Sequence, residues 1–259
     1  MYATNYFETK ILNLARSVSL TAPAKLYLGL FLNNPEDTGG GTEISYSGYS
    51  RKEIKFDAPI SLGNAGLEIR NSELITFAQC NANIGNVGYI GIFDAATGGN
   101  MLLFGQLTTP IAVQHDVSPI VRAQMIRYIM TGNMNEYYRT AVLNTLRGMN
   151  CSGFTPYLAL FNGSPDSGGI EFVGNGYARV AMNFSVPSEQ SNGNSQTSNT
   201  SLVTTPEATG LWGQLTHVAI YDAAANGHAF MTIPLDSSYN VTEGTVIQFQ
   251  PGKFKMNIN

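Results

Sequence analysis

The chain has 259 residues, of which 43% are hydrophobic and only 12% are charged. This composition excludes a disordered chain, and a formal net charge of -4 offers no basic surface for nucleic acid. No apolar run is long enough to cross a membrane, and Glu8 and Lys10 interrupt the segment where a secretion signal would lie. The sequence therefore predicts a soluble protein that binds neither nucleic acid nor membrane.

The first segment predicts a short amphipathic helix. Its apolar residues recur at spacings of three and four, and Asn5 precedes them as a candidate N-cap. These residues are Phe7, Ile11, Leu14, Ala15 and Val18. We expect one helix at the head of the chain, with this apolar stripe buried.

The rest of the first half predicts short strands joined by turns. The apolar run 25–32 ends at a turn-forming Asn-Asn-Pro string, and 51–56 alternates charged and apolar residues, as a strand with one solvated face does. Further strands are expected at 73–77, 87–94, 101–107 and 120–130. Many short strands of this kind predict a mainly β domain, either a β-sandwich or a jelly-roll-like fold.

The second half repeats the first. The string 27–31 returns as 157–161, and the string 48–51 returns as 176–179. Apolar residues match apolar residues, and the gaps fall in loops. An internal repeat of this length indicates two copies of one structural unit.

The repeat predicts two tandem domains, 1–131 and 132–259, each a β-sandwich or jelly-roll-like repeat preceded by one helix. The second helix is expected behind Asn135, where Tyr138, Val142 and Leu146 form the same stripe as in the first copy. The junction contains no Pro-rich or Ser-rich linker. We therefore expect the two domains to abut, with an orientation fixed by packing.

Two segments of the second half differ from the general pattern. The stretch 187–200 is dense in Ser, Asn and Gln, whereas its counterpart 59–72 contains several aliphatic residues. It is interpreted as a surface loop that diverged after duplication and as a place to meet partners. The run 249–258 is expected to end a sheet at the C-terminus, and it is a candidate docking strand through edge pairing.

The sequence predicts no catalytic residue, no cofactor and no metal site. Neither a Gly-x-Ser-x-Gly string nor a His-Glu-x-x-His string occurs. Cys80 and Cys151 are too few for a disulfide framework, and both are interpreted as buried thiols. Asp94 and Asp222 each follow an apolar strand, where a carboxylate can bond backbone amides two residues on; they are interpreted as turn formers.

One arginine recurs at the same position in both copies, directly after a Gly-Tyr pair. Two arrangements are open, because the guanidinium can stack on that tyrosine or can pair with a glutamate that also recurs. A structural clamp is favoured over a ligand site. The residues are Glu43, Tyr49 and Arg51 in the first copy and Glu171, Tyr177 and Arg179 in the second.

The single tryptophan, Trp212, lies in a Gly-Leu-Trp-Gly string that the first copy lacks. An exposed indole there would be a sugar platform or a protein anchor, and the favoured alternative is a tryptophan that covers the end of its own core. The candidate contacts to a partner or a glycan are Trp212, Tyr177, Arg179, Tyr49 and Arg51.

Several strings in the second copy together resemble a family of small tailed-bacteriophage virion proteins, commonly labelled tail-fibre-like or structural. They are Tyr157-Leu158-Ala159-Leu160-Phe161, Gly176-Tyr177-Ala178-Arg179, Gly210-Leu211-Trp212-Gly213 and Asp222-Ala223-Ala224. The first copy lacks the Trp-Gly portion. The resemblance implies a phage particle component without enzyme activity, located in the tail, in the neck or on the capsid surface.

The expected function is therefore that of a non-enzymatic structural component of a tailed-phage virion. Its expected partners are other virion proteins and further copies of itself in a homo-oligomer, ring or lattice. Its expected location is the virion, after assembly in the host bacterial cytoplasm. Two alternatives stay open: a glycan- or receptor-binding module on the virion, and a hydrolase whose site carries no known signature.

Overall fold

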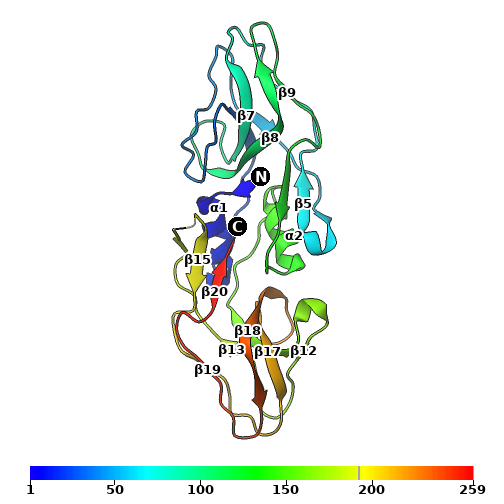
Figure 1. The fold of residues 1–259 in the computed structure, drawn as a ribbon, viewed down its shortest axis with the longest axis vertical. Helices are drawn as coiled ribbons and strands as arrows, with labels where there is room; N and C mark the ends of the chain where they lie inside the picture. Colours follow the sequence, from blue (N-terminus) through cyan, green and yellow to red (C-terminus); the bar gives the residue numbers. More distant parts are fainter. Residues whose placement is uncertain (192, 259) are drawn as a thin grey trace.

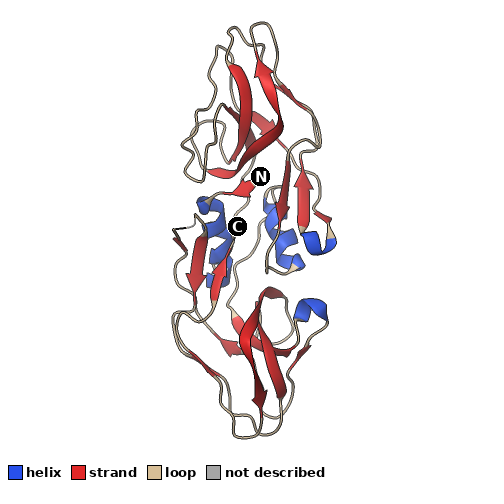
Figure 2. Cartoon of the chain, viewed as in Figure 1, coloured by secondary structure: helices blue, strands red, loops and turns tan. Residues whose placement is uncertain are grey.

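The computed structural model describes residues 1–191 and 193–258. Asn192, in the polar stretch 187–200, and Asn259, at the end of the second predicted domain, lie outside the described residues. The protein is mainly β, as predicted, with antiparallel sheets throughout. The molecule is elongated: one main sheet lies at each end, and both α-helices lie between them (Figures 1 and 2).

The first copy builds its main sheet from five strands in the order β1-β8-β7-β2-β3 and a smaller sheet in the order β10-β5-β4, while β6 pairs with β9. Its elements are β1 (Tyr2–Ala3), α1 (Asn5–Leu12), the 3-10 helix η1 (Asn13–Arg16), β2 (Leu26–Phe31), β3 (Lys52–Ile54), β4 (Ile60–Ser61), the 3-10 helix η2 (Gly63–Ala65), β5 (Leu67–Arg70), β6 (Ile75–Thr76), β7 (Gly85–Phe93), β8 (Met101–Val113), β9 (Ile120–Val121) and β10 (Arg127–Met130).

The second copy repeats this plan. Its main sheet has the order β12-β11-β17-β18, with β13 also paired to β11, and its smaller sheet has the order β14-β15-β20, while β16 pairs with β19. Its elements are α2 (Glu136–Thr145), β11 (Tyr157–Asn162), the 3-10 helix η3 (Pro165–Ser167), β12 (Ile170–Glu171), β13 (Val180–Ala181), β14 (Ser188–Glu189), β15 (Ser195–Ser198), β16 (Val203–Thr204), β17 (Gly213–Tyr221), β18 (Ala229–Val241), β19 (Gln248–Phe249) and β20 (Lys255–Asn257).

The strand registers match between copies. Gly91 lies opposite Phe104 in the β7–β8 hairpin, and Ala219 lies opposite Thr232 in the β17–β18 hairpin. In both strands of the hairpin, each second-copy residue therefore lies the same number of positions along the sequence from its first-copy counterpart. This agreement at single-residue level is what a duplicated unit predicts.

Both predicted helices form, with one correction to a cap. The N-cap of α1 is Thr4, whose Oγ1 accepts from the backbone N–H of Phe7, and not Asn5, which is the first helical residue. Asn135 caps α2 as predicted, and it stands in the second copy where Thr4 stands in the first. Val18 is also not on the buried stripe: α1 ends at Leu12, the 3-10 turn η1 follows, and Val18 is 47% exposed.

The predicted strands of the first half form, except that 120–130 is not continuous. It divides into β9 and β10 around a turn in which Gln124 has a φ of 65° and donates its backbone N–H to Asn71 O at 2.8 Å. The run 249–258 also divides, into β19 and β20, and β20 pairs with β15 inside the chain. Docking of another protein through this strand stays a prediction.

The described part of the polar stretch 187–200 is not one continuous surface loop, which corrects the prediction, while its role in meeting partners stays a prediction. It contains β14 and β15, and Ser195, Thr197 and Asn199 alternate along one buried face. Hydrogen bonds take the place of apolar burial there: Asn199 Oδ1, for example, accepts from the backbone N–H of Phe254 at 2.9 Å. Polar side chains can occupy a strand interior when their groups are satisfied in this way.

The smaller sheets lie beside the helices of the opposite copies. Helix α1 contacts β15 and β20 of the second copy, and α2 contacts β5 of the first (Figure 1). One hydrophobic cluster runs through both copies and includes Ile11 and Leu14 together with Val142 and Leu143. The boundary at 131/132 lies between β10 and α2, and the division into two domains stays a prediction.

The copies also meet backbone to backbone. Leu20 and Cys151, which hold equivalent positions in the two copies, exchange two hydrogen bonds of 2.8 and 3.0 Å, the pattern expected across a local two-fold axis. Gly153 lies beside this bridge, and a Cβ at that position would meet the backbone of Ser17 and Val18.

None of the helices in the described part of the chain has the length and apolar character of a membrane-spanning helix.

Candidate functional site

The recurring arginine of the first copy pairs with the recurring glutamate. Arg51 Nε donates to Glu43 Oε1 at 3.0 Å, and Arg51 Nη2 donates to Glu43 Oε2 at 2.8 Å. Tyr49 Oη donates to the same carboxylate at 2.9 Å and accepts from the backbone N–H of Leu30 at 3.0 Å. Arg51 Nη1 also donates to Gly98 O at 2.8 Å. We call Glu43, Tyr49 and Arg51 the first clamp.

The second copy contains the same clamp, made by Glu171, Tyr177 and Arg179. Both Arg179–Glu171 hydrogen bonds are 2.7 Å long, and Tyr177 Oη donates to Glu171 Oε1 at 2.9 Å. Arg179 Nη1 donates to Asn226 O, the counterpart of Gly98 O, at 2.6 Å. Each clamp therefore ties the glutamate-bearing segment, which pairs with a strand of the main sheet, to the loop that closes the central hairpin of that sheet.

The clamps confirm one of the two arrangements that the sequence left open. The guanidinium pairs with the glutamate and does not stack on the neighbouring tyrosine; it lies instead over another ring. Arg51 Cζ is 3.3 Å from the ring centroid of Phe93, and Arg179 Cζ is 3.6 Å from that of Tyr221. Bidentate geometry together with ring stacking is available to arginine but not to lysine.

The clamp side chains are largely enclosed. The Arg179 side chain is 7% exposed and the Arg51 side chain is 12% exposed. Burial raises the pKa of Tyr49 and that of Tyr177, so both phenols stay protonated and donate at neutral pH. Contact of these four residues with a partner or a glycan stays a prediction.

The recurring aspartates form turns, as predicted, but over a longer span. Asp94 Oδ1 accepts from the backbone N–H of Asn100 at 2.6 Å, and Asp222 Oδ1 accepts from that of His228 at 2.7 Å. Both bonds reach further along the chain than the two positions that the sequence suggested. The carboxylates therefore close the same loops to which the clamp arginines donate.

Trp212 covers the core of its own copy, which was the favoured interpretation. It is 8% exposed, and its Nε1–H donates to Asn175 O at 2.8 Å. Its ring packs against Tyr177 at a centroid distance of 5.3 Å and against Phe172 at 6.1 Å. The indole is therefore not an exposed platform in this structure, and a role in contacting a partner or glycan stays a prediction.

Both cysteines are free and buried, as predicted. Cys151 lies on the bridge between the two copies, and burial raises the pKa of its thiol to about 11. The sulfur is therefore a protonated thiol at neutral pH, which is the unreactive form.

Sequence reasoning missed one residue at the contact between copies. Glu8 on α1 is 2% exposed, and its Oε2 accepts from the backbone N–H of Ser195, in β15, at 2.7 Å. Its pKa is raised to about 7: burial is the largest cause, the carboxylates of Asp37 and Glu189 act in the same direction, and the hydrogen bonds from Ser195 lower it. The helical spacing could have indicated this burial, because Glu8 lies one turn before Leu12 on the same face of the helix.

Two copies that share a core, and whose recurring charged residues brace their own loops, define a tandem structural repeat protein of mainly β type. The family model described as podophage GP4 fiber I protein gp80 matches residues 2–127 and, a second time, residues 133–257. The chain belongs to this family and contains two copies of its unit in tandem. The predicted resemblance to virion structural proteins is confirmed, and no curated protein matches the chain.

Proposed function

We propose that the protein is a non-enzymatic structural component of a tailed-phage virion and that it acts through protein–protein contacts. The observation that carries this proposal is the match of both copies to a phage fibre family. The geometry supports it, because the recurring ionisable residues bond one another and nearby backbone carbonyls. Residues held in this way stiffen loops, and rigid loops on a sheet scaffold suit the presentation of a surface to partners.

The partners in this proposal are other virion proteins and further copies of the chain. An elongated molecule with a similar sheet at each end presents two related surfaces (Figure 1). One chain can then occupy two quasi-equivalent positions in a ring or lattice, which also fixes the number of copies. The proposed location is the tail, the neck or the capsid surface, after assembly in the host bacterial cytoplasm.

Immunogold labelling of purified particles tests this function. An antibody against the whole chain is applied to wild-type particles and to particles from a phage that lacks the gene. We expect label at one defined place on wild-type particles and none on the deletion particles. Protein that accumulates in infected cells but is missing from purified particles would contradict the proposal.

The glycan-binding alternative has weaker support, because its principal candidate residue, Trp212, is buried and hydrogen-bonded. Under our proposal the protein shows no saturable binding to host-surface sugars at millimolar concentration. Saturable binding that is lost in a folded Trp212→Phe variant would favour the alternative. Release of reducing ends from host polysaccharide by the purified protein would contradict the non-enzymatic part of the proposal.

A further inference from the structure

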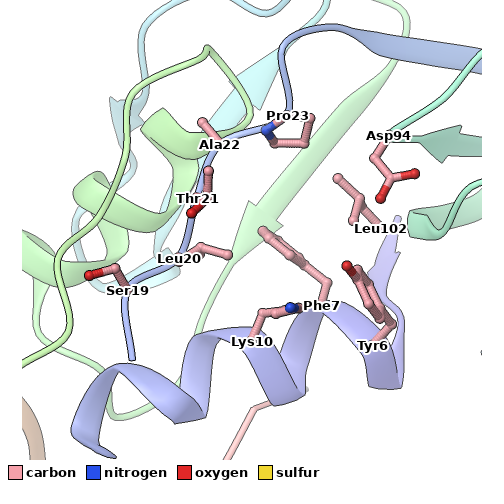
Figure 3. Close-up of a pocket in the computed structure, with 10 residues that line it drawn as sticks. All are labelled: Tyr6, Phe7, Lys10, Ser19, Leu20, Thr21, Ala22, Pro23, Asp94 and Leu102. Atoms are coloured by element: carbon pink, nitrogen blue, oxygen red, sulfur yellow. The ribbon is translucent and has the colours of Figure 1, made fainter. Parts of the chain in front are cut away.

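The first copy contains an open pocket of about 340 Å³ beside α1. Side chains of α1 form one wall, the segment from Ser19 to Pro23 forms the facing wall, and Asp94 and Leu102 complete the rim (Figure 3). Two of the lining residues, Phe7 and Leu102, are apolar and almost fully buried, and Asp94 brings a carboxylate to the edge. The pocket thus combines apolar groups with polar ones, among them the Asp94 carboxylate, the Tyr6 hydroxyl and the Lys10 ammonium.

The equivalent place in the second copy is filled by aromatic rings. Tyr138, Phe154 and Phe230 contact one another with centroid distances of 5.1, 5.1 and 5.2 Å. All three are at most 8% exposed. The chain therefore contains one open and one filled version of the same site.

Smaller side chains explain why the first version is open. Counted from the backbone bridge that joins the copies, Pro23 takes the place of Phe154, and of Pro23 and the exposed Ala24 only Pro23 lines the pocket. Leu102 stands where the second copy has Phe230, as the matching registers of the two hairpins require. Phe7 lacks the hydroxyl of its tyrosine counterpart. The first copy thus lacks one complete ring, part of a second ring and one hydroxyl group.

The carboxylate that would accept from the missing hydroxyl is present in the first copy. In the second copy Tyr138 Oη donates to Asp222 Oδ2 at 2.9 Å. Asp94, the counterpart of Asp222, accepts from the backbone N–H of Asn100 at 2.6 Å and from its Nδ2 at 2.9 Å. A carboxylate offers about four lone-pair sites, so Asp94 can accept a further donor from the pocket.

We propose that this pocket binds a tyrosine side chain presented by another polypeptide of the virion. The ring takes the place that Phe154 fills in the second copy, and the hydroxyl donates to Asp94. This inference rests on the proposed function only in placing the donor polypeptide in the virion. A ring with a polar tip that enters a preformed pocket is the usual form of an energetically dominant contact at a protein interface.

Binding of p-cresol, which carries the tyrosine ring and hydroxyl, tests the site in the isolated full chain. Titration is followed by NMR, with toluene as the ring without the hydroxyl. We expect saturable binding with a Kd on the order of 1 mM, weaker binding of toluene, and shifts confined to residues around the pocket.

Four variants locate the binding. Pro23→Phe and Leu102→Phe, each of which copies the filled site, should weaken p-cresol binding by about tenfold or more. Ala24→Phe, which adds the same ring to a neighbouring position outside the pocket lining, should leave it unchanged. Asp94→Asn keeps one oxygen acceptor for the loop but removes the charge, and it should bring p-cresol affinity close to that of toluene.

Three results would overturn the inference: no saturable binding of p-cresol, unchanged binding in both filled variants, or preferential binding of a monosaccharide. These outcomes are separate from the proposed function. If the chain binds p-cresol but is missing from particles, only the proposed function is refuted. If the chain is present in particles but does not bind p-cresol, only the proposed tyrosine site is refuted.

Discussion

Glu8→Gln tests the contact between copies, because the wild-type carboxyl is buried at that contact and forms no ion pair with any residue that the structure describes. Its Oε2 accepts from the backbone N–H of Ser195 at 2.7 Å, and the nearby Asp37 and Glu189 repel a negative charge. Burial and this repulsion together raise the pKa from 4.5 to about 7. Ionising Glu8 therefore costs more in the folded protein than in the unfolded chain.

The pKa values give both the sign and the size of the effect. Between pH 4.5 and about 7 the folded protein holds a proton on Glu8 that the unfolded chain has lost, so stability falls as the pH rises through this window. The difference of about 2.5 pH units corresponds to about 3 kcal/mol, which is fully lost above pH 7. Below pH 4.5 both states are protonated, and the penalty disappears.

A glutamine at this position keeps an oxygen that accepts from Ser195 N–H and never ionises. Glu8→Gln should therefore be more stable than wild type by about 3 kcal/mol at pH 8 and equal to it near pH 4. Urea denaturation at pH 4, 6 and 8, followed by tryptophan fluorescence, measures this difference.

The control is Glu73→Gln, which removes an exposed acid whose ion pair with Lys55 is solvent-accessible on both sides. It should change stability by less than about 1 kcal/mol at every pH. A Glu8→Gln variant with the same stability difference at pH 4 and pH 8, or one less stable than wild type at pH 8, would refute the reasoning.

Three further predictions concern the clamps, the filled site and the contact between copies. Glu171→Ala leaves its buried arginine unpaired and should cost about 3–5 kcal/mol by urea denaturation, whereas the exposed Glu53→Ala should cost less than about 1 kcal/mol; equal losses would contradict the clamp. Phe154→Ala opens a cavity in the second copy and should cost about 3–5 kcal/mol in the same assay, and a loss below about 1 kcal/mol would show that the ring is not packed as described. If the two copies are co-expressed as separate chains, 1–131 and 132–259, they should co-purify as a one-to-one complex, because each helix lies against the other copy. Two monomers that do not bind each other would contradict this packing.

The sequence predicts the parts of the fold that rest on periodicity and on internal repetition. Equal spacing of Glu43 and Arg51, and of Glu171 and Arg179, pointed to the pairing that the structure shows. Local pattern was sufficient because each clamp joins segments of one copy. The cap of α1 was misplaced by one position, since Thr4 and Asn5 are both good caps and only the backbone geometry separates them.

Sequence patterns do not predict the contacts between the two copies. A repeat shows that two units are alike but not which helix lies on which sheet. The strand β15 carried no apolar alternation, because Ser195 and Thr197 are buried through hydrogen bonds where the first copy has Leu67 and Ile69. The sequence shows that a small residue, Pro23, takes the place of Phe154. That this difference leaves a pocket open follows only from the ring contacts that Phe154 makes in the second copy.

A cryo-electron microscopy map of the intact virion tests the central claim most directly. The account predicts an elongated density that fits both copies of the chain as one body and that touches neighbouring virion proteins through its surface. A map in which every protein density is assigned to other chains, with this one missing, would contradict it.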